Sequence, residues 1–328
     1  MITRENTKTI YDLVRNAGKE YGKKVFLRYE ENEVVYDVTY EEFAAQCMAI
    51  AAWVKDQDEK AGRKVRVGLL GSSSHHYLAV LLGVMSNGNV GIPLDIQMNV
   101  DTLSDCLNRS DVDILFYDWE HHALVEGAKD KCPAITQYIS LQHGKHVPCS
   151  DKILKEYEGR SVIPDVSPQD CALVLFTSGT TGRGKGVMLS NGNLIDNVFC
   201  TTDTDNPENE TYLNVLPIHH VFCLNGDIFI VMRYGSTLCL NRDMTKLAAH
   251  IQLFQPSVIR MVPMIAKALY NRIAILSRQD PKRSINAIRS EVLGKRLHKI
   301  ISGGGYLAPE LAANFNRIGI AIAQGYGM

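Results

Sequence analysis

The sequence predicts an α/β protein with two similar, mainly parallel, doubly wound sheets and flanking helices. Short apolar runs alternate with segments of helical periodicity along the 328 residues, a pattern typical of βαβ units. The alternation starts again after a polar stretch at residues 144–168. We therefore expect one subdomain over residues 1–165 and a second over residues 166–328.

The first subdomain is expected to open with an amphipathic helix over residues 7–21. Thr39-Tyr40-Glu41-Glu42 has the pattern of a capping box, which predicts a helix that runs to about residue 55. The other predicted strands are residues 25–29, 34–38, 65–70, 90–93 and 114–117, and the other predicted helices are residues 76–85, 100–108 and 121–129.

The second subdomain is expected to repeat this alternation. Its predicted strands are residues 186–189, 212–216, 237–240, 258–262, 298–302 and 320–323. A helix is expected after each strand from 212–216 to 298–302, which again indicates a parallel sheet.

The composition is that of an ordinary globular protein, with 45% hydrophobic residues and a net charge of -1. This charge gives no general attraction to nucleic acid or to an acidic membrane surface. Eight cysteines without a C-x-x-C pair, and an N-terminus without a signal-peptide core, favour a cytoplasmic location. No apolar run approaches the roughly 20 residues that a transmembrane helix needs, so no such helix is expected.

The most informative stretch is residues 173–189, in which an apolar strand leads into a loop of hydroxyls and glycines. Glycines let backbone N–H groups turn inward, and such a nest with hydroxyls and an ammonium group binds a polyphosphate. The candidate ligands are Thr177, Ser178, Gly179, Thr180, Thr181, Gly182 and Lys185. A hairpin with a Gly-Thr turn would explain the glycines, but it would not explain the hydroxyls or the lysine.

A Walker A loop is a second interpretation, because Gly179 to Lys185 satisfies G-x-x-x-x-G-K. That motif then requires Ser or Thr to hold Mg²⁺, and position 186 is glycine. It also opens into a helix, whereas residues 186–189 are typical of a strand. An NTPase or kinase is therefore disfavoured.

The segment Thr-Ser-Gly-Thr-Thr-Gly-Arg-Gly-Lys-Gly at residues 177–186 resembles the signature loop of the adenylate-forming superfamily. This group includes acyl-CoA synthetases, luciferases and the adenylation domains of peptide synthetases. Most members have proline where this chain has Gly184, and we expect the glycine to make the loop more flexible. The resemblance covers essentially the whole chain and implies the two-subdomain fold predicted above.

Leu-Pro-Ile-His-His-Val-Phe at residues 216–222 resembles the Leu-Pro-x-x-His segment that acyl-CoA synthetases place beside the acyl substrate. The resemblance gives His220 a position beside the carboxylate and makes Lys185 and His220 the catalytic candidates. The amino-acid-activating branch usually has Asp in this region, so the histidine disfavours an amino-acid substrate. Candidates for the acyl wall, which could equally be core residues, are Val221, Phe222, Val262 and Met264.

Two further segments resemble nucleotide-binding parts of the family. Gly303, Gly304 and Gly305 match a glycine segment that lies against the purine, although alone they could be a tight turn. Tyr326 matches the adenine-stacking residue of Gly-Tyr-Gly-x-Thr-Glu, whose Glu holds Mg²⁺. Because the sequence stops at Met328, the resemblance places the main Mg²⁺ ligand beyond it and implies no metal site within these residues.

The resemblance implies an ATP-dependent ligase that converts a fatty or aryl carboxylic acid to acyl-AMP and then transfers the acyl group to CoA or a carrier-protein pantetheine. It also implies that these residues end before the β-barrel subdomain and the C-terminal domain. We therefore expect no full turnover, and an apolar edge that favours self-association. The open alternatives are a non-catalytic nucleotide- or acyl-binding protein of the same fold, and an amino-acid adenylation domain.

Overall fold

The computed structural model describes residues 1–142, 148–177, 184–200 and 209–325. They form two compact units. Unit 1 consists of Met1–Lys24 and Val38–Thr202, and unit 2 consists of Val25–Asp37 and Asp203–Met328. The chain therefore passes from one unit to the other at three points.

This division differs from the predicted boundary between residues 165 and 166. The strand before the predicted phosphate loop, β7 (Cys171–Phe176), pairs with β4 (Val90–Leu94) and extends the sheet of unit 1. Near the N-terminus, β1 (Val25–Glu31) pairs with β10 (Thr237–Leu240) and belongs to the sheet of unit 2. Both strands pair with segments far away along the chain, so a polar stretch alone did not locate the boundary.

The sheet of unit 1 has six strands in the order β6-β5-β3-β4-β7-β8. Besides β4 and β7, these strands are β3 (Arg66–Leu70), β5 (Ile114–Tyr117), β6 (Gln137–Ser140) and β8 (Gly186–Ser190). Neighbouring strands are parallel from β6 to β7, and the pair β7–β8 is antiparallel. The mainly parallel sheet is confirmed, and the carboxyl ends of β3, β4, β5 and β7 lie along one edge.

The capping box at the start of α2 (Tyr40–Ala61) is also confirmed. The N–H of Glu42 donates to Thr39 Oγ1 at 3.3 Å, and the N–H of Thr39 donates to Glu42 Oε2 at 2.8 Å. The remaining helices of unit 1 are α1 (Ile10–Tyr21), α3 (His75–Ser86), α4 (Val100–Arg109), the 3-10 helix η1 (Trp119–His121), α5 (His122–Lys129), α6 (Ser150–Glu156) and α7 (Asn191–Cys200).

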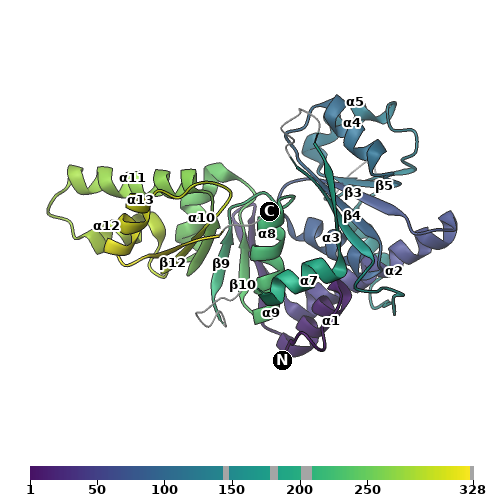
Figure 1. Ribbon diagram of the computed structural model, residues 1–328, viewed down its shortest axis with the longest axis horizontal. Helices are drawn as coiled ribbons and strands as arrows, with labels where there is room; N and C mark the ends of the chain where they lie inside the picture. The colour runs from purple at the N-terminus through teal and green to yellow at the C-terminus, as the bar shows by residue number, and fades with distance from the viewer. Residues whose placement is uncertain (143–147, 178–183, 201–208, 326–328) are drawn as a thin grey trace. The chain divides into compact units, whose positions relative to one another are not determined.

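Helices cover both faces of this sheet, as a doubly wound fold requires (Figure 1). Leu107 of α4 and Leu115 of β5 share a buried core on the face that α4 and α5 cover. The next residue of β5, Phe116, points to the opposite face, because successive strand side chains alternate. There its ring packs edge-on against Trp53 of α2, with the ring centroids 5.6 Å apart.

The sheet of unit 2 has seven strands in the order β13-β12-β11-β9-β10-β1-β2. Besides β1 and β10, these strands are β2 (Val34–Thr39), β9 (Thr211–Asn214), β11 (Val258–Met261), β12 (Lys299–Ser302) and β13 (Ala321–Gln324). All neighbouring strands from β13 to β1 are parallel. The second parallel sheet predicted from the sequence is thus confirmed.

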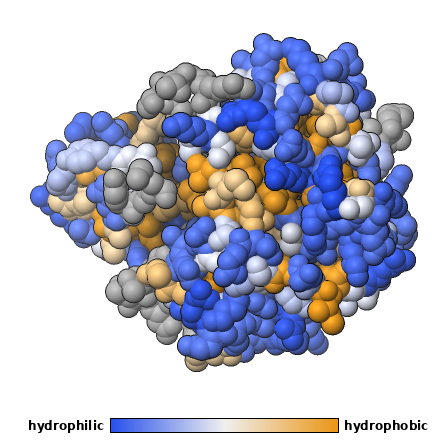
Figure 2. All heavy atoms as spheres, turned by 45° about the vertical axis from the view of Figure 1, so that its right-hand side comes forward, coloured by the Kyte–Doolittle hydropathy of each residue, from blue (hydrophilic) through white to orange (hydrophobic). Residues whose placement is uncertain are grey.

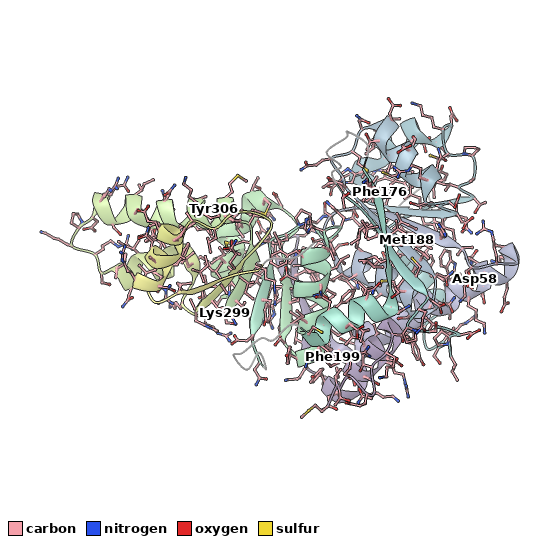
Figure 3. All side chains as sticks on the ribbon, viewed as in Figure 1. Asp58, Phe176, Met188, Phe199, Lys299 and Tyr306 are labelled. Carbon is pink, nitrogen blue, oxygen red and sulfur yellow. The ribbon has the colours of Figure 1, made fainter. Side chains whose placement is uncertain are left out.

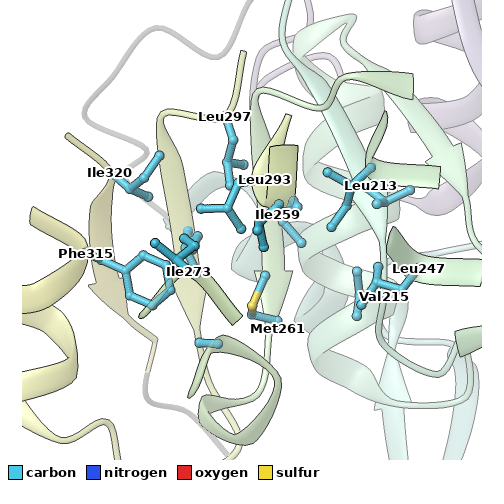
Figure 4. Close-up of a cluster of buried hydrophobic side chains, with 14 of the residues drawn as sticks. Leu213, Val215, Leu247, Ile259, Met261, Ile273, Leu293, Leu297, Phe315 and Ile320 are labelled. Atoms are coloured by element: carbon cyan, nitrogen blue, oxygen red, sulfur yellow. The ribbon is translucent and has the colours of Figure 1, made fainter. Parts of the chain in front are cut away.

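Helices of unit 2 bury one face of its sheet under a large apolar cluster (Figure 4). Leu213 and Ile259 of the sheet lie in this cluster with Leu247, Ile273 and Phe315 of the covering helices. The helices of unit 2 are α8 (Val221–Cys223), the π-helix η2 (Leu224–Phe229), α9 (Ile230–Tyr234), the 3-10 helix η3 (Met244–Lys246), α10 (Leu247–Phe254), α11 (Pro263–Gln279), α12 (Ile285–Leu293) and α13 (Pro309–Arg317).

Strand β6 and helices α6 and α7 of unit 1 were absent from the prediction. Strand β6 has four residues and helix α6 has seven, and α6 lies inside the polar stretch that we interpreted as a seam. Segments this short carry too few periods of a helical or strand pattern to be recognised. Strand β6 is defined instead by its pairing with β5, where Leu115 aligns with Tyr138.

Hydrophilic residues cover most of the face shown in Figure 2, with hydrophobic residues visible between them. Single exposed apolar side chains are normal on a globular protein. Within the described part of the chain, no helix combines the length and the apolar character that crossing a membrane requires.

Candidate functional site

The predicted phosphate loop is carried by the hairpin of β7 and β8 in unit 1. Thr177 directly follows β7 and Lys185 directly precedes β8. The N–H of Thr177 donates to the carbonyl oxygen of Lys185 at 3.0 Å, which continues the antiparallel pairing of Phe176 with Gly186. The predicted ligands Ser178, Gly179, Thr180, Thr181 and Gly182 lie outside the described residues.

This hairpin places both loop ends at the carboxyl edge of the parallel strands. Strand β7 runs parallel to β4, with Leu173 aligned with Gly91, so Thr177 leaves the sheet at the same edge as the ends of β3, β4 and β5. Ligands of open α/β sheets bind outside this edge. Lys185 is exposed there, and the described residues give it no ion-pair partner.

Gly184 is packed closely against the backbone of the hairpin. A Cβ atom at this position would lie 2.6 Å from the carbonyl oxygen of Thr177, which is too close for any other residue in this conformation. The carbonyl oxygen of Gly184 accepts a hydrogen bond from Arg109 Nη1 at 2.7 Å. In this backbone conformation, position 184 therefore accepts only glycine.

His220 lies in unit 2, where it begins helix α8. Its Nδ1 accepts a hydrogen bond from the N–H of Phe222 at 3.2 Å, so the ring proton is on Nε2 in the neutral form. Partial burial of the ring lowers the pKa of His220 below its ordinary value of 6.5. At neutral pH the side chain is therefore a neutral imidazole, and the described residues give its Nε2–H donor no recorded partner.

The three predicted glycines follow strand β12 in unit 2 and differ in their roles. A Cβ atom at Gly303 would lie 2.7 Å from the ring of Phe222, so this glycine makes room for an aromatic side chain of its own unit. Gly304 has a φ of 72°, which favours glycine for backbone reasons. Gly304 and Gly305 are exposed, whereas Gly303 is buried. Their exposed backbone leaves a surface without side chains.

Two candidates for the acyl wall lie in different surroundings in unit 2. Val262 lies 3.5 Å from the Cβ position of Gly304, and Met264 is 76% exposed, so Met264 is not a core residue. Tyr326 lies outside the described residues. Among the described residues, no group of three or more His, Cys, Asp or Glu side chains could hold a metal ion.

A buried ion pair beneath helix α8 was not predicted. Arg260 Nη1 of β11 donates to Asp227 Oδ1 of the π-helix η2 at 3.2 Å, and both side chains are at most 3% exposed. The Asn214 amide of β9 donates to Leu216 O at 2.9 Å and lies 3.4 Å from Asp227 Oδ2. The pair therefore ties the helix that begins at His220 to two strands of the sheet.

Burial raises the pKa of Asp227 to about 6, and the charge of Arg260 opposes this rise. A Cβ atom at Gly226 would lie 2.7 Å from the Arg260 side chain. The absence of a side chain at Gly226 therefore leaves the room in which the Arg260 guanidinium approaches Asp227. A signal for this pair exists in the sequence, since each charge interrupts an apolar run. The partners are 33 residues apart, so the signal does not identify the pairing.

The family model of AMP-binding enzymes matches residues 14–328, and the chain belongs to this family. The match confirms the resemblance to the adenylate-forming superfamily. A feruloyl-CoA synthase of Amycolatopsis is 27% identical over 298 residues, which cover 89% of this chain and 54% of that protein. Long-chain-fatty-acid–CoA ligase 6 of Mus musculus is 23% identical, with 82% of this chain and 42% of that protein covered. The chain thus spans about half the length of these relatives.

Among solved structures, the inhibitor-bound N-terminal domain of FACL13 from Mycobacterium tuberculosis is similar to this chain, with a TM-score of 0.80. The sequences are 20% identical, and the match covers 98% of this chain and 76% of that one. At this identity the likeness shows the fold alone, and it confirms the predicted fold class.

Proposed function

We propose that this chain carries the nucleotide- and acid-binding region of an enzyme that activates a carboxylic acid with ATP. A carboxylate oxygen attacks the α-phosphorus, the bond from that phosphorus to the bridging oxygen of the β-phosphate breaks, and acyl-AMP and pyrophosphate form. The acyl group then passes to a thiol such as CoA, and AMP leaves. The observation that carries this proposal is the position of Thr177 and Lys185 at the carboxyl edge of the sheet, at the two ends of the hydroxyl-rich loop.

The first step needs no covalent protein nucleophile, because the carboxylate itself attacks. It needs positive charge and N–H donors around the phosphates as negative charge moves toward the leaving pyrophosphate. The exposed ammonium group of Lys185 and the hydroxyl of Thr177 are suited to this role. Gly304 and Gly305 offer an exposed backbone surface against which a planar purine could lie.

His220 is proposed to orient the acid. Because the pKa of His220 is lowered and Nδ1 is occupied by the Phe222 N–H, the ring presents a neutral Nε2–H donor. A neutral donor holds a carboxylate oxygen without the strong charge pairing that would reduce its nucleophilicity. A protonated histidine would bind the acid more tightly but make it a poorer nucleophile.

The acid is proposed to have a neutral fatty or aryl tail. An amino-acid substrate would need an anion for its ammonium group, and Asp227 of the adjacent helix is 0% exposed and paired with Arg260. The residues after His220 are the apolar Val221 and Phe222. The names of the relatives, a feruloyl-CoA synthase and a long-chain-fatty-acid–CoA ligase, also support this class.

Binding of acyl-adenylate mimics tests the proposal on this chain. Calorimetry would compare sulfamoyl-adenosine analogues that carry a fatty, an aryl or an aminoacyl group with the same nucleoside without an acyl group. We expect a fatty or aryl analogue to bind about 100-fold more tightly than the unacylated nucleoside, as intermediate mimics do. Tightest binding by an aminoacyl analogue would overturn the substrate class.

Pyrophosphate exchange on the full-length protein tests the reaction. Because the chain spans about half the length of the curated relatives, this assay uses the whole protein and not only the residues described above. Exchange that depends on a fatty or aryl acid supports the proposal. Release of ADP would indicate a kinase, and ATP binding without any exchange would indicate a non-catalytic nucleotide-binding protein.

A further inference from the structure

Arg109, the last residue of helix α4, contacts the hairpin of the phosphate loop within unit 1. Its Nη1 donates to the carbonyl oxygen of Gly184 at 2.7 Å. The same Nη1 also donates to Asp105 Oδ2 at 3.1 Å, one helical turn earlier. The guanidinium carbon lies 5.6 Å from the centre of the Phe176 ring. No sequence motif pointed to this residue.

These contacts lie next to the two ends of the loop. Phe176 is the last residue of β7 and precedes Thr177, and Gly184 precedes Lys185, which in turn directly precedes β8. Figure 3 shows Phe176 and Met188 on these neighbouring strands. One guanidinium therefore holds the peptide that carries Lys185 and rests on the residue before Thr177.

The geometry fixes the guanidinium rather than leaving it free to move. Asp105 holds one edge, the Phe176 ring supports one face by a cation–π contact, and the Gly184 carbonyl receives a hydrogen bond. A charge-assisted hydrogen bond is stronger and more directional than a neutral one. Because Gly184 accepts no side chain of its own, this external contact supplies the restraint that a proline ring would give.

A hollow of about 130 Å³ borders Arg109, Phe176 and Met188. If the guanidinium is removed, water in this hollow can hydrogen-bond the Gly184 carbonyl. Arg109 is also partly exposed, so its replacement leaves no buried charge without a partner. The expected loss is therefore in the position of the loop and not in the folding of unit 1.

We propose that Arg109 is a positioning residue for the phosphate loop, which sets the Gly184–Lys185 peptide so that the lysine meets the terminal phosphates of ATP. This inference rests on the proposed nucleotide-binding function of the loop. It predicts that the effect of Arg109 passes through Lys185, and hence that ATP binding is affected more than AMP binding.

The test compares Arg109→Met, Arg109→Lys and a matched control, Arg317→Met. Arg317, in unit 2, is also the last residue of a helix, α13, and its Nη1 donates to Asn314 Oδ1 three residues earlier. Calorimetry would measure the affinities of all variants for ATP and AMP. Arg109→Met is expected to weaken ATP binding about 3- to 10-fold and AMP binding less, because a partly exposed contact acts through a neighbour.

A double-mutant cycle separates positioning from general destabilisation. In a Lys185→Ala background, Arg109→Met should have little further effect on ATP affinity, because residues that act through one another are not additive. Arg109→Lys should recover part of the loss, since an ammonium group can still reach the carbonyl. Equal effects of Arg109→Met and Arg317→Met, or full additivity with Lys185→Ala, would overturn the proposal.

Amide hydrogen exchange gives a readout that needs no nucleotide. The Thr177 N–H that bonds the Lys185 carbonyl should exchange faster in Arg109→Met than in the control. Unchanged exchange would overturn the positioning role even if ATP binds. If exchange is faster in Arg109→Met but the chain binds no ATP, Arg109 does position the hairpin, and the proposed nucleotide-binding function of the loop is wrong.

Discussion

The two candidate regions hold their functional residues in opposite ways. In unit 1, a partly exposed arginine, Arg109, contacts the backbone carbonyl of Gly184, the residue before Lys185. In unit 2, His220 begins a helical segment that the buried ion pair of Asp227 and Arg260 connects to strand β11. Exposed contacts cost little when they are lost, whereas a buried charge that loses its partner costs a great deal. Substitutions in unit 1 should thus change ligand binding, and those in unit 2 should change stability.

The largest effect is expected from Arg260→Met, which leaves the Asp227 carboxylate buried without its partner. Breaking a buried ion pair from one side costs about 3–5 kcal/mol, and we expect the free energy of unfolding to fall by that amount. Denaturant unfolding monitored by circular dichroism would measure it. Adding Asp227→Asn should recover part of the loss. If Arg260→Met alone lowers the free energy of unfolding by less than about 1 kcal/mol, the proposed difference between the two units is wrong.

The pH dependence of stability should show the same buried carboxyl. Burial raises the pKa of Asp227 from 3.8 to about 6, so the folded protein binds this proton more tightly than the unfolded chain. The resulting stabilisation is fully present below about pH 4 and disappears as pH rises through about 6, a change of about 3 kcal/mol. Unfolding curves between pH 4 and 7 would show this slope in the wild type. Its persistence in Asp227→Asn would assign the slope to other groups.

Gly303→Ala should destabilise unit 2 by overpacking. The new methyl group would lie 2.7 Å from the Phe222 ring, and such overpacking typically costs about 1–3 kcal/mol. Gly305→Ala is the matched control, because its Cβ would make an ordinary contact of 3.5 Å with Pro263. The two variants should differ in thermal midpoint. Equal midpoints would show that the Phe222 ring moves away freely.

Lys185→Ala should have the smallest effect on stability and a clear effect on binding. The exposed ammonium group has no recorded partner among the described residues, so we expect the unfolding free energy to change by less than about 0.5 kcal/mol. ATP affinity should fall about tenfold and AMP affinity less, because the charge is placed nearest the leaving pyrophosphate. Calorimetry with both nucleotides is the measurement. Equal losses for ATP and AMP would contradict this position of the lysine.

The difference between the two regions also explains what the sequence could predict. The hairpin that carries Thr177 and Lys185 is formed by residues close together in the chain, so its strands and its ends follow from local pattern. The capping box at Thr39 is likewise local and was confirmed. The mainly parallel sheets were also predictable, because few folds other than an α/β fold with a parallel sheet accommodate alternating strands and helices.

Contacts between distant segments were not predictable. Arg109 and Gly184 are 75 residues apart, and nothing near either residue indicates the other. The sequence around Asp227 and around Arg260 shows a charge within an apolar run, but it does not indicate which residue pairs with that charge. The boundary between the units was misplaced for the same reason, since β1 and β7 belong where their distant partners lie.

The place of β1 sets an order of events during synthesis of the chain. Phe26 and Leu27 are fully buried in the finished sheet, yet Leu27 aligns with Leu238, which emerges from the ribosome more than 200 residues later. At about 5–20 residues per second, the segment waits roughly 10–40 s for its partner strand. Unit 1 closes around residues on both sides of that segment and can be complete first. Strand β2 can pair with β1 early, but the edge of β1 that pairs with β10 stays open until β10 is made, and the apolar residues Phe26 and Leu27 stay without their final cover.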